Sequence, residues 1–545
     1  MNFIKNETEQ KLRGGYYTPL DLAIYVTQWA LQNEPKQILE PSCGDGVFFE
    51  AISKLSLTHN MQATAFELLE SEANKAKEKC KINPCLKSKI HTTDFLQWSI
   101  PRIQKKQTLF DAVIGNPPFI RYQYLSKEAQ VKAEAIFDLL NLKFTKHTNA
   151  WVPFVLSSLA LLKEGGRLAM VLPAEIIHVL HAQSLRTFLG DECSKLLIID
   201  PAEIWFEGTL QGAVILLAEK KCKKHQHSEG VGIIRVQGRD FLQECSSSIF
   251  NNVDRINGKT VEGKWTPALL TSIERDIIDN VRTLDNVHAF NAIAKVDVGI
   301  VTGANNFFLV SNDVVKNNGL EQWAHPMFGR SNHCPGLIYD DKQHSSNEET
   351  GLPTNFIWLR DLEGLKISSK VKKYIKRGEE NKLHTRYKCR IRKPWYTVPS
   401  VYSTNVGMLK RAHHAPKLIF NKIEAYTTDT AYRITTQEKN PKKLVYSFLN
   451  SLTALSAELE GRHYGGGVLE LVPSEIEKLI VPLPNNIRIN LSRIDKLIRT
   501  CGMEEVLFEQ NKCILKNVGL LGNEQDVIFS AWNRLRKRRQ REIVA

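Results

Sequence analysis

Several common features are missing from this chain of 545 residues, and each absence argues against a class of protein. No apolar run reaches the roughly eighteen residues that a membrane span needs, and no charged segment followed by an apolar one opens the chain. The 10 cysteines follow irregular spacings without a Cys-x-x-Cys pair. We therefore expect no membrane span, no secretory signal, no disulfide framework and no metal site, and we expect a cytoplasmic protein.

The glycine patterns of the common nucleotide sites are also missing. After the first expected strand there is no Gly-x-Gly-x-x-Gly pattern and no Gly-Lys-Ser/Thr. The strand runs instead into a loop with two glycines and two acids, made of Glu40, Pro41, Ser42, Cys43, Gly44, Asp45 and Gly46. Glycines let the backbone approach a ligand. The acids would repel a pyrophosphate but suit a ligand that carries a cationic amine or sulfonium.

The net charge of +14 is confined to one part of the chain. Residues 1–220 contain 24 basic and 24 acidic residues, so the remainder carries the whole excess. A hydrophilic break at Lys220–His227 separates the two parts. We predict a catalytic domain at 1–222, a domain that binds and recognises a polyanion at 228–500, and a basic helical segment at 501–545. A solvated basic surface without a binding role is the alternative.

The segment from Phe110 to Phe119 is the centre of the functional prediction. Apolar residues run into Gly115, and the next two prolines prevent the strand from continuing. The sequence predicts a buried parallel strand that ends in a rigid turn, with Asn116 and Pro117 offering two carbonyl acceptors side by side. Two such acceptors suit the two N–H bonds of a planar amino group, and Phe119 can lie against its ring. A simple turn with an asparagine cap is the alternative.

Acidic residues follow two further predicted strands. Glu67 ends the strand that begins at Gln62, about twenty residues beyond the glycine loop, where an acid typically accepts hydrogen bonds from ribose hydroxyls. Asp94 ends the next strand, and Phe95 follows it. We expect Asp94 to accept from an adenine amino group and Phe95 to lie against the adenine ring. Either acid alone is more often an ordinary solvated side chain, but one acid at each strand end favours a binding site.

Strands and helices alternate through residues 12–220, which predicts an α/β fold with a mostly parallel, doubly wound sheet and a hairpin at its edge. Thr18 is a plausible helix N-cap, because Pro19 and an apolar helical stretch follow it. A helix start can receive a carboxylate on its free N–H groups. The remaining strands are expected at 167–173, 195–200 and 212–219.

These motifs together resemble the gamma-order N6-adenine DNA methyltransferases of restriction–modification systems. That family has a Thr-Pro helix start, Glu-Pro-x-Cys/x-Gly, a ribose-binding acid, Asp-Phe and Asn-Pro-Pro-Tyr/Phe, in the order found here over residues 12–220. The resemblance implies a seven-stranded Rossmann-like methyltransferase domain followed by a mixed α/β target-recognition domain. Phe119 replaces the commoner tyrosine, which loses a hydroxyl but keeps the ring.

The resemblance also assigns the site. S-adenosylmethionine is the implied cofactor: Thr18 and the 40–46 loop hold its methionine part, Glu67 its ribose, and Asp94 and Phe95 its adenine, with Pro118 beside it. The implied catalytic residues are Asn116 and Pro117, which grip the target amino group, and Phe119 and Phe206, which stack on a base flipped out of the duplex. The implied partner is double-stranded DNA. We expect a monomer, with a cognate restriction endonuclease acting as a separate protein.

Three patches stand out beyond the break. Asp297–Val310 contains turn residues, Gly299–Asn306, between apolar runs; Arg386–Tyr396 interleaves basic and aromatic residues; and Arg462–Gly467 is a glycine-rich loop. Cations between aromatic residues suit a nucleic-acid surface, and all three patches resemble segments of the recognition domains of these methyltransferases. For any one patch a solvated basic strand is about as good an interpretation.

Other hypotheses share part of this pattern. The Asn-Pro-Pro-aromatic turn also serves enzymes that methylate protein glutamine or RNA, although these do not usually carry a large basic domain behind it. N4-cytosine methyltransferases more often have Ser or Asp in place of Asn116. A fused nuclease would need a metal site, and Asp200 with Glu219-Lys220-Lys221 matches the spacing by chance, on strands assigned to the methyltransferase sheet. A DNA-binding protein with an inactive catalytic domain is a further alternative.

Overall fold

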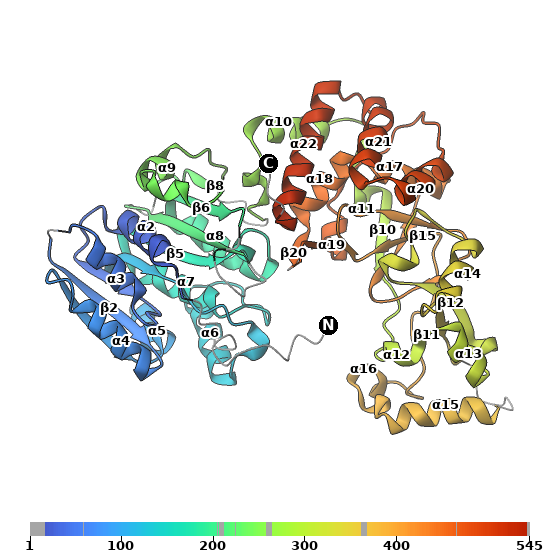
Figure 1. Cartoon of the computed structure of the whole chain (residues 1–545), viewed down its shortest axis with the longest axis horizontal. Helices are drawn as coiled ribbons and strands as arrows, with labels where there is room; N and C mark the ends of the chain where they lie inside the picture. Colours follow the sequence, from blue (N-terminus) through green and yellow to red (C-terminus); the bar gives the residue numbers. More distant parts are fainter. Residues whose placement is uncertain are drawn as a thin grey trace. The chain divides into compact units, whose positions relative to one another are not determined.

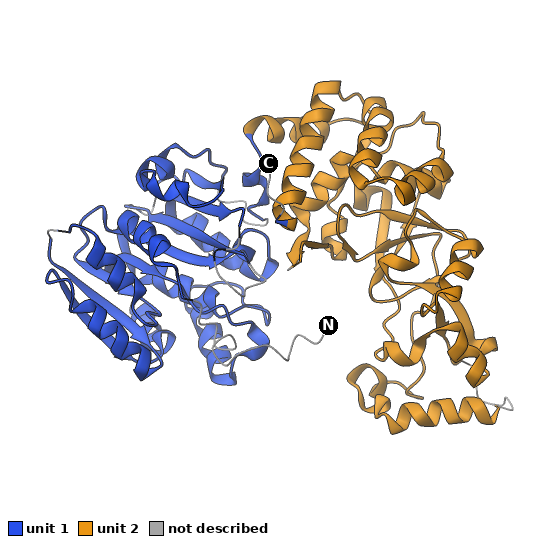
Figure 2. Cartoon of the chain, viewed as in Figure 1, with its two compact units in different colours: residues 1–271, 541–545 blue, residues 272–540 orange. Residues whose placement is uncertain are grey.

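The computed structural model describes residues 17–57, 59–203, 205, 212–223, 225–257, 264–360, 368–464 and 466–541. The chain divides into two compact units, shown in Figure 2. Unit 1 comprises residues 1–271 and 541–545, and unit 2 comprises residues 272–540. The hydrophilic break at Lys220–His227 therefore lies inside unit 1, between two strands of its sheet.

Unit 1 is built on one large mixed sheet. Among the described residues this sheet has eight strands in the order β3-β2-β1-β4-β5-β7-β6-β8. All neighbouring strands are parallel except β7, which is antiparallel to both β5 and β6. The strands are β1 (Gln37–Glu40), β2 (Met61–Glu67), β3 (Leu86–Thr92), β4 (Phe110–Gly115), β5 (Leu162–Pro173), β6 (Cys193–Pro201), β7 (Ala213–Lys220) and β8 (Gly230–Val236).

Helices cover both faces of this sheet (Figure 1). One face packs against α5 (Phe95–Gln104), α6 (Lys127–Leu139), α7 (Trp151–Leu161) and α8 (Gln183–Glu192). The other face packs against α2 (Leu20–Leu31), α3 (Val47–Lys54), α4 (Glu70–Cys80) and α9 (Ser246–Asn252). The doubly wound α/β prediction is confirmed. The described sheet has eight strands where seven were predicted, because β8 pairs with β6, and the β6–β7 hairpin therefore does not lie at the edge of the sheet.

The strand sequences explain why both faces are covered. Along β4, Val113 belongs to one hydrophobic core, while its neighbours Ala112 and Ile114 belong to the core on the opposite face. All three side chains are fully buried. Because successive side chains of a strand point to opposite faces, a continuous apolar run needs helices on both sides. This packing buries the middle of β4 and leaves its carboxyl end, which carries Asn116, at the edge of the sheet.

Unit 2 contains several smaller sheets. Among the described residues they are β10-β19-β15-β17-β13, β11-β14-β12-β18, β16-β21-β20 and β22-β9. The strands are β9 (Val287–Ala289), β10 (Ala294–Val298), β11 (Leu309–Val310), β12 (Ala324–Phe328), β13 (Ile338–Tyr339), β14 (Asn355–Ile357), β15 (Val406–Leu409), β16 (Arg411–Ala412), β17 (Leu418–Asn421), β18 (Tyr426–Thr427), β19 (Ala431–Thr436), β20 (Arg462–Tyr464), β21 (Val468–Glu470) and β22 (Ile480–Pro482). The prediction of mixed α/β structure beyond the first sheet is confirmed.

The helices of unit 2 gather mainly at two ends of it, as Figure 1 shows. They are α10 (Ser272–Val281), α11 (Phe290–Ile293), α12 (Asn305–Phe308), α13 (Asn312–Asn318), α14 (Asp341–Glu349), α15 (Ser369–Glu380), α16 (Tyr387–Arg390), α17 (Pro441–Phe448), α18 (Ser451–Glu460), α19 (Pro473–Ile476), α20 (Leu491–Thr500), α21 (Met503–Asn517) and α22 (Gly522–Gln540). None of the helices in the described residues of the chain is long and apolar enough to cross a membrane.

The basic C-terminal helix α22 is packed into unit 2. Trp532 and Leu535 are buried in it, and the Arg539 guanidinium pairs with the carboxylate of Glu458 on α18 at 2.8 Å, both side chains being inaccessible to solvent. A fully buried, hydrogen-bonded ion pair costs several kcal/mol when one partner is removed. Arg539 therefore stabilises the fold of unit 2 and is not available to a ligand.

Candidate active site

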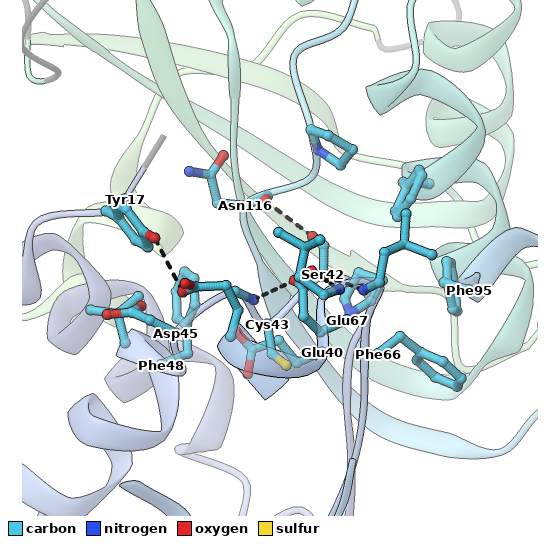
Figure 3. Close-up of a pocket in the computed structure, with 18 of the residues that line it drawn as sticks. Tyr17, Glu40, Ser42, Cys43, Asp45, Phe48, Phe66, Glu67, Phe95 and Asn116 are labelled. Atoms are coloured by element: carbon cyan, nitrogen blue, oxygen red, sulfur yellow. Dashed lines mark hydrogen bonds between the residues drawn. The ribbon is translucent and has the colours of Figure 1, made fainter. Parts of the chain in front are cut away.

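A cavity of about 830 Å³ opens where β1, β2 and β4 of unit 1 end. The predicted positions that line it are Thr18, Glu40, Pro41, Ser42, Cys43, Gly44, Asp45, Glu67, Asp94, Phe95, Asn116 and Pro118, and Figure 3 shows most of them converging on one space. In a parallel sheet the carboxyl ends of neighbouring strands meet at one edge, which is where ligands bind. Residues from four separate sequence motifs thus form a single pocket.

The loop after β1 has a shape that only glycine allows. Gly46 has a φ of +84°, and a Cβ atom there would lie 2.7 Å from the Cα of Ala76 on α4. Gly44 also has a positive φ, +51°, but faces open space. A side chain at position 46 would meet both backbone strain and a steric clash. Gly46 therefore allows α3 and α4 to approach closely.

Glu40 is the most unusual group in the pocket. Its side chain is fully buried, and neither carboxylate oxygen has a hydrogen-bond partner in the described structure. Burial, and next the negative charges of Asp45 and Glu67, raise the pKa of Glu40 well above its ordinary value. A buried carboxyl without a partner costs free energy unless a ligand satisfies it. An amine or sulfonium cation would do so, and both groups are present in S-adenosylmethionine.

Glu67 is held by backbone amides at the end of β2. Its Oε2 accepts from the N–H of Gly44 at 3.0 Å, and its Oε1 accepts from the N–H groups of Leu68 and Leu69 at 2.8 and 2.9 Å. Three backbone donors hold the carboxylate in place. They also fix its direction, and Oε2, which accepts only one of these bonds, keeps capacity for a further donor such as a ribose hydroxyl.

Asp94 is also fixed on both sides. Its Oδ1 accepts from the N–H of Leu96 and so caps α5, while its Oδ2 pairs with the ammonium of Lys132 at 2.8 Å. Phe95 beside it is buried, with its ring centre 5.3 Å from that of Phe66. Lys132 was not among the predicted site residues, because an isolated lysine on a helix gives no signal of this pairing.

Asn116 joins the loop and the chain segment before α2. Its Nδ2 donates to Oγ1 of Thr18 at 3.1 Å, and its backbone carbonyl accepts from Oγ of Ser42 at 3.1 Å (Figure 3). These bonds fix the amide plane and the backbone at the start of the turn. Pro117 is buried, whereas Phe119 is half-buried and packs against both hydrophobic cores of unit 1. Phe206, the second predicted aromatic residue, lies outside the described residues.

The interpretation of Thr18 as a helix cap is wrong. Helix α2 begins at Leu20 with Pro19 as its N-cap, and no side chain caps it. Pro19 has an extended ψ of 139°, so the helix starts one residue later than predicted. Thr18 is buried with its hydroxyl directed to Asn116. Thr18 does line the cavity, but there its hydroxyl accepts a hydrogen bond from Asn116 and does not cap a helix.

Several residues that line the cavity were missed by the sequence analysis: Tyr17, Val47, Phe48, Phe66, Leu68, Leu69, Glu72, Thr93, Ile120, Tyr124 and Phe154. Some of these were detectable, because Phe66 and Thr93 directly precede predicted acids. Phe154 was not, because it lies on α7 and reaches the site only through packing. The Tyr17 hydroxyl donates to Glu72 at 3.1 Å, which links the chain before α2 to α4.

The nuclease-like spacing of Asp200 and Glu219 does not form a site. Strand β6 pairs with β7 so that Lys195 faces Glu219, which places Asp200 five positions away along β6, or about 16 Å. Lys220 is buried and donates to the backbone carbonyls of Leu159 and Leu162. No cluster of potential metal ligands occurs among the residues that the structure describes. The acids are simply too far apart for one metal ion.

Fold and site together define a class. A doubly wound sheet with one antiparallel strand beside β6, a glycine loop after β1 and acids after β1, β2 and β3 are the features of an S-adenosylmethionine-dependent methyltransferase. The unsatisfied carboxyl of Glu40 fits the cationic part of that cofactor.

Comparison with known proteins narrows the class. Residues 49–205 match the family model "Eco57I restriction-modification methylase", and residues 262–515 match "Type II methyltransferase M.Eco57I, C-terminal domain". The chain is 24% identical over 496 residues to the Type II methyltransferase M.AccI of Acinetobacter calcoaceticus, covering 85% of this chain and 84% of that protein. It is 21% identical over 489 residues to M.XamI of Xanthomonas campestris pv. amaranthicola, covering 87% and 86%.

Among solved structures, the chain is similar to the type IIG restriction endonuclease BpuSI, with 13% identity and a TM-score of 0.43 over 96% of this chain and 66% of that one. A nuclease-deletion mutant of the Type ISP enzyme LlaGI has 12% identity and a TM-score of 0.47, over 89% and 54% of the two chains. The chain is a DNA methyltransferase of a restriction–modification system, and its sequence is similar to those of the Type II methyltransferases of the Eco57I family. Its cofactor is S-adenosylmethionine.

Proposed function

We propose that this DNA methyltransferase acts on the exocyclic N6 of adenine within one double-stranded DNA sequence, and so protects host DNA from a restriction endonuclease. The observation that carries the proposal is Asn116, at the end of β4, in the wall of the cofactor cavity. Its amide is oriented by Thr18 and its backbone by Ser42. The proposal treats the chain as a monomer and the endonuclease as a separate protein.

The proposed mechanism follows from the chemistry of the adenine amino group. Its nitrogen is a poor nucleophile because the lone pair is delocalised into the ring. The amide oxygen of Asn116 and the backbone carbonyl of Pro117 would accept its two hydrogens, which returns electron density to nitrogen. Acceptors that bind most strongly as charge develops stabilise the transition state selectively. No strong base is needed first, because the nitrogen loses its proton easily once it is methylated.

The remaining pocket residues have supporting roles in this proposal. S-adenosylmethionine supplies the methyl group, on a sulfonium. Glu40 and the loop through Gly46 would hold its methionine part, Glu67 its ribose, and Asp94 and Phe95 its adenine, with Pro118 beside it. Phe119 and Phe206 would stack on the flipped base and recover part of the roughly few kcal/mol that flipping costs. The fixed carboxylates of Glu67 and Asp94 support these assignments.

Unit 2 is the proposed recognition domain, because residues 272–540 hold 40 basic and 29 acidic residues, which is +11 of the net +14 of the chain. Phosphate contacts give affinity for any duplex, and contacts to bases select the sequence. Residues 228–271, which the sequence analysis assigned to recognition, fold with unit 1. The proposal therefore concerns chiefly residues 272–540.

The direct test is to sequence DNA from cells that express the chain and to detect modified bases. The proposal expects N6-methyladenine in one sequence context, and no modification from the Asn116→Ala variant. Modified cytosine in place of adenine would replace the adenine assignment but keep the enzyme class. Unmodified DNA, with methyl transfer to RNA or to a protein glutamine in a tritium assay, would overturn the proposal.

A further inference from the structure

Two of the three patches found in the sequence form one surface in unit 2. The Arg392 guanidinium donates to the backbone carbonyls of Thr302 and Val301 at 2.7 and 2.8 Å. The thiol of Cys389, which is buried, donates to the same Thr302 carbonyl at 3.9 Å. We call residues 301–303 and 386–393 the tip. Arg392 and Cys389 therefore hold the two segments of the tip together.

A glycine makes this junction possible. Gly303 has a φ of +81°, and a Cβ atom there would lie 2.7 Å from the Cβ of Lys388 on α16. Helix α16 thus sits directly on the turn before α12. Figure 1 shows α16 at the same end of unit 2 as α12 and α15, and away from α17, α18, α20, α21 and α22. The tip is an extremity of unit 2 that is held in a defined shape.

Apolar side chains cover the outside of the tip. Tyr387 is 63% exposed and Ile391 is 61% exposed, while Val301 beside their anchor is 38% exposed. The charged ends of Lys388 and Arg390 lie 5.5 and 5.6 Å from the centre of the Tyr387 ring. Large side chains this exposed, on an anchored segment, suggest a partner rather than incomplete folding.

The charge of the tip identifies the kind of partner. Arg386, Lys388, Arg390 and Lys393 form no ion pair with any acid in the described part of the chain. Elsewhere in unit 2, by contrast, Arg411 pairs with Glu470 and Arg462 pairs with Glu475. Four cations without acidic partners in the described residues, interleaved along the segment with the exposed Tyr387 and Ile391, suit a nucleic-acid groove, which offers phosphates to cations and bases to apolar side chains.

We propose that the tip enters a groove of the DNA duplex, with its four cations on the phosphates and with Tyr387 and Ile391 pressed between neighbouring base pairs. The inference rests on the proposed function, since it takes double-stranded DNA as the substrate. An apolar wedge flanked by cations unstacks a base step and bends the duplex. The same bend favours sequences that deform easily, so the tip contributes to sequence choice.

The first test uses the full-length protein and a short duplex that contains the sequence it methylates. The double variant Lys388→Ala/Arg390→Ala should make the negative slope of log affinity against log salt shallower by about 2, the value for two lost phosphate contacts. The matched control is Lys512→Ala on α21, whose ammonium also lies over an exposed aromatic ring, that of Phe508, at 4.3 Å. The control should keep the wild-type slope. An unchanged slope in the double variant would overturn the assignment of phosphate contacts.

The second test distinguishes the role of the apolar side chains of Tyr387 and Ile391, the wedge, from the role of the four cations. Tyr387→Ala with Ile391→Ala should leave the salt slope unchanged but weaken binding by about tenfold, the scale of one lost base stack. If 2-aminopurine is placed at the base step that the tip contacts, its fluorescence should rise when the wild-type protein or the Phe508→Ala control binds and unstacks that step. It should not rise when the Tyr387→Ala/Ile391→Ala variant binds. If this variant gives the same rise in fluorescence as the wild type, the inference is wrong, whereas the proposed function is unaffected as long as the wild-type protein methylates DNA. If the wild-type chain binds no duplex, the proposed function fails as well.

Discussion

Asn116 and Thr18 are 98 residues apart in the sequence, yet the amide nitrogen of Asn116 donates to the hydroxyl of Thr18 at 3.1 Å. One residue ends the central strand, and the other precedes the first described helix. The bond orients the side chain on which the proposed chemistry depends. It also connects the turn after β4 to the chain segment before α2, and both residues line the cavity.

Replacing Asn116 should remove the chemical step. Asn116→Ala deletes one of two acceptors that matter most in the transition state, so single-turnover methyl transfer should slow by roughly 10²–10³. Duplex binding should persist, because recognition uses other groups. If Asn116 were only a turn cap, alanine would cost about 1 kcal/mol of stability and leave turnover of the folded protein intact. A melting curve recorded beside the kinetics distinguishes the two outcomes.

Thr18 should act through Asn116. Thr18→Val removes the hydroxyl that orients the amide, so we expect methyl transfer at saturating cofactor to slow by about tenfold, the scale of one positioning hydrogen bond. Thr18→Ser keeps the hydroxyl and serves as the control, with a rate near wild type. The single-turnover rate is the measurement. Equal rates for valine and serine variants would show that the bond has no part in positioning.

Glu67 should contribute to cofactor affinity. Glu67→Gln removes the charge of a carboxylate that lines the cavity, and we expect the Kd for S-adenosylmethionine to rise by about tenfold, the scale of lost hydrogen bonds to a charged group. Titration calorimetry measures the change. Glu70→Gln, on the exposed start of α4, is the matched control and should bind as wild type does. Unchanged affinity in Glu67→Gln would remove this residue from the cofactor site.

Glu40 should make both stability and binding depend on pH. Its pKa is raised above 4.5 in the folded protein, so at pH values above 4.5 the unfolded chain releases the proton while the folded chain keeps it. The carboxyl therefore lowers stability as pH rises from 4.5 to the folded pKa. Cofactor-free Glu40→Gln should melt at a higher temperature than wild type at pH 8, and the difference should vanish near pH 4.

The same group should link cofactor binding to proton release. A cationic ligand favours the ionised carboxyl, so the affinity of the wild type for S-adenosylmethionine should rise with pH, while that of Glu40→Gln should be about tenfold weaker and lack this dependence. Calorimetry in two buffers of different ionisation enthalpy measures the released proton. A Glu40→Gln protein with wild-type affinity and pH dependence would contradict the proposed contact.

Gly46 should tolerate alanine less well than Gly44 does. Both have positive φ, which costs about 1 kcal/mol for a residue with a Cβ, but only position 46 adds a 2.7 Å approach to Ala76. We expect Gly46→Ala to lower the free energy of unfolding by about 2 kcal/mol more than Gly44→Ala, through overpacking. Urea unfolding of the two variants gives the comparison. Equal losses would mean that α4 moves aside without cost.

Local patterns in the sequence were enough to predict much of unit 1. The apolar run of β4 and the prolines after Gly115 defined a buried strand and a turn, because strands and turns depend on neighbouring residues. The acids at positions 67 and 94 were located at strand ends for the same reason. The alternating strands and helices then predicted the doubly wound sheet, in which carboxyl ends share one edge. The pocket followed from this order of elements.

Tertiary structure alone decided which distant groups meet. The bond between Thr18 and Asn116, the pairing of Lys132 with Asp94, and the packing of α16 on Gly303 join segments whose separation no periodicity encodes. The isolation of Glu40 from any partner is likewise a property of the packed layers around β1. The sequence by itself determined the strands, the turns and the chemistry available at their ends. Side-chain packing between layers determined which of those groups are buried, oriented or left exposed, because burial and contact depend on the whole fold.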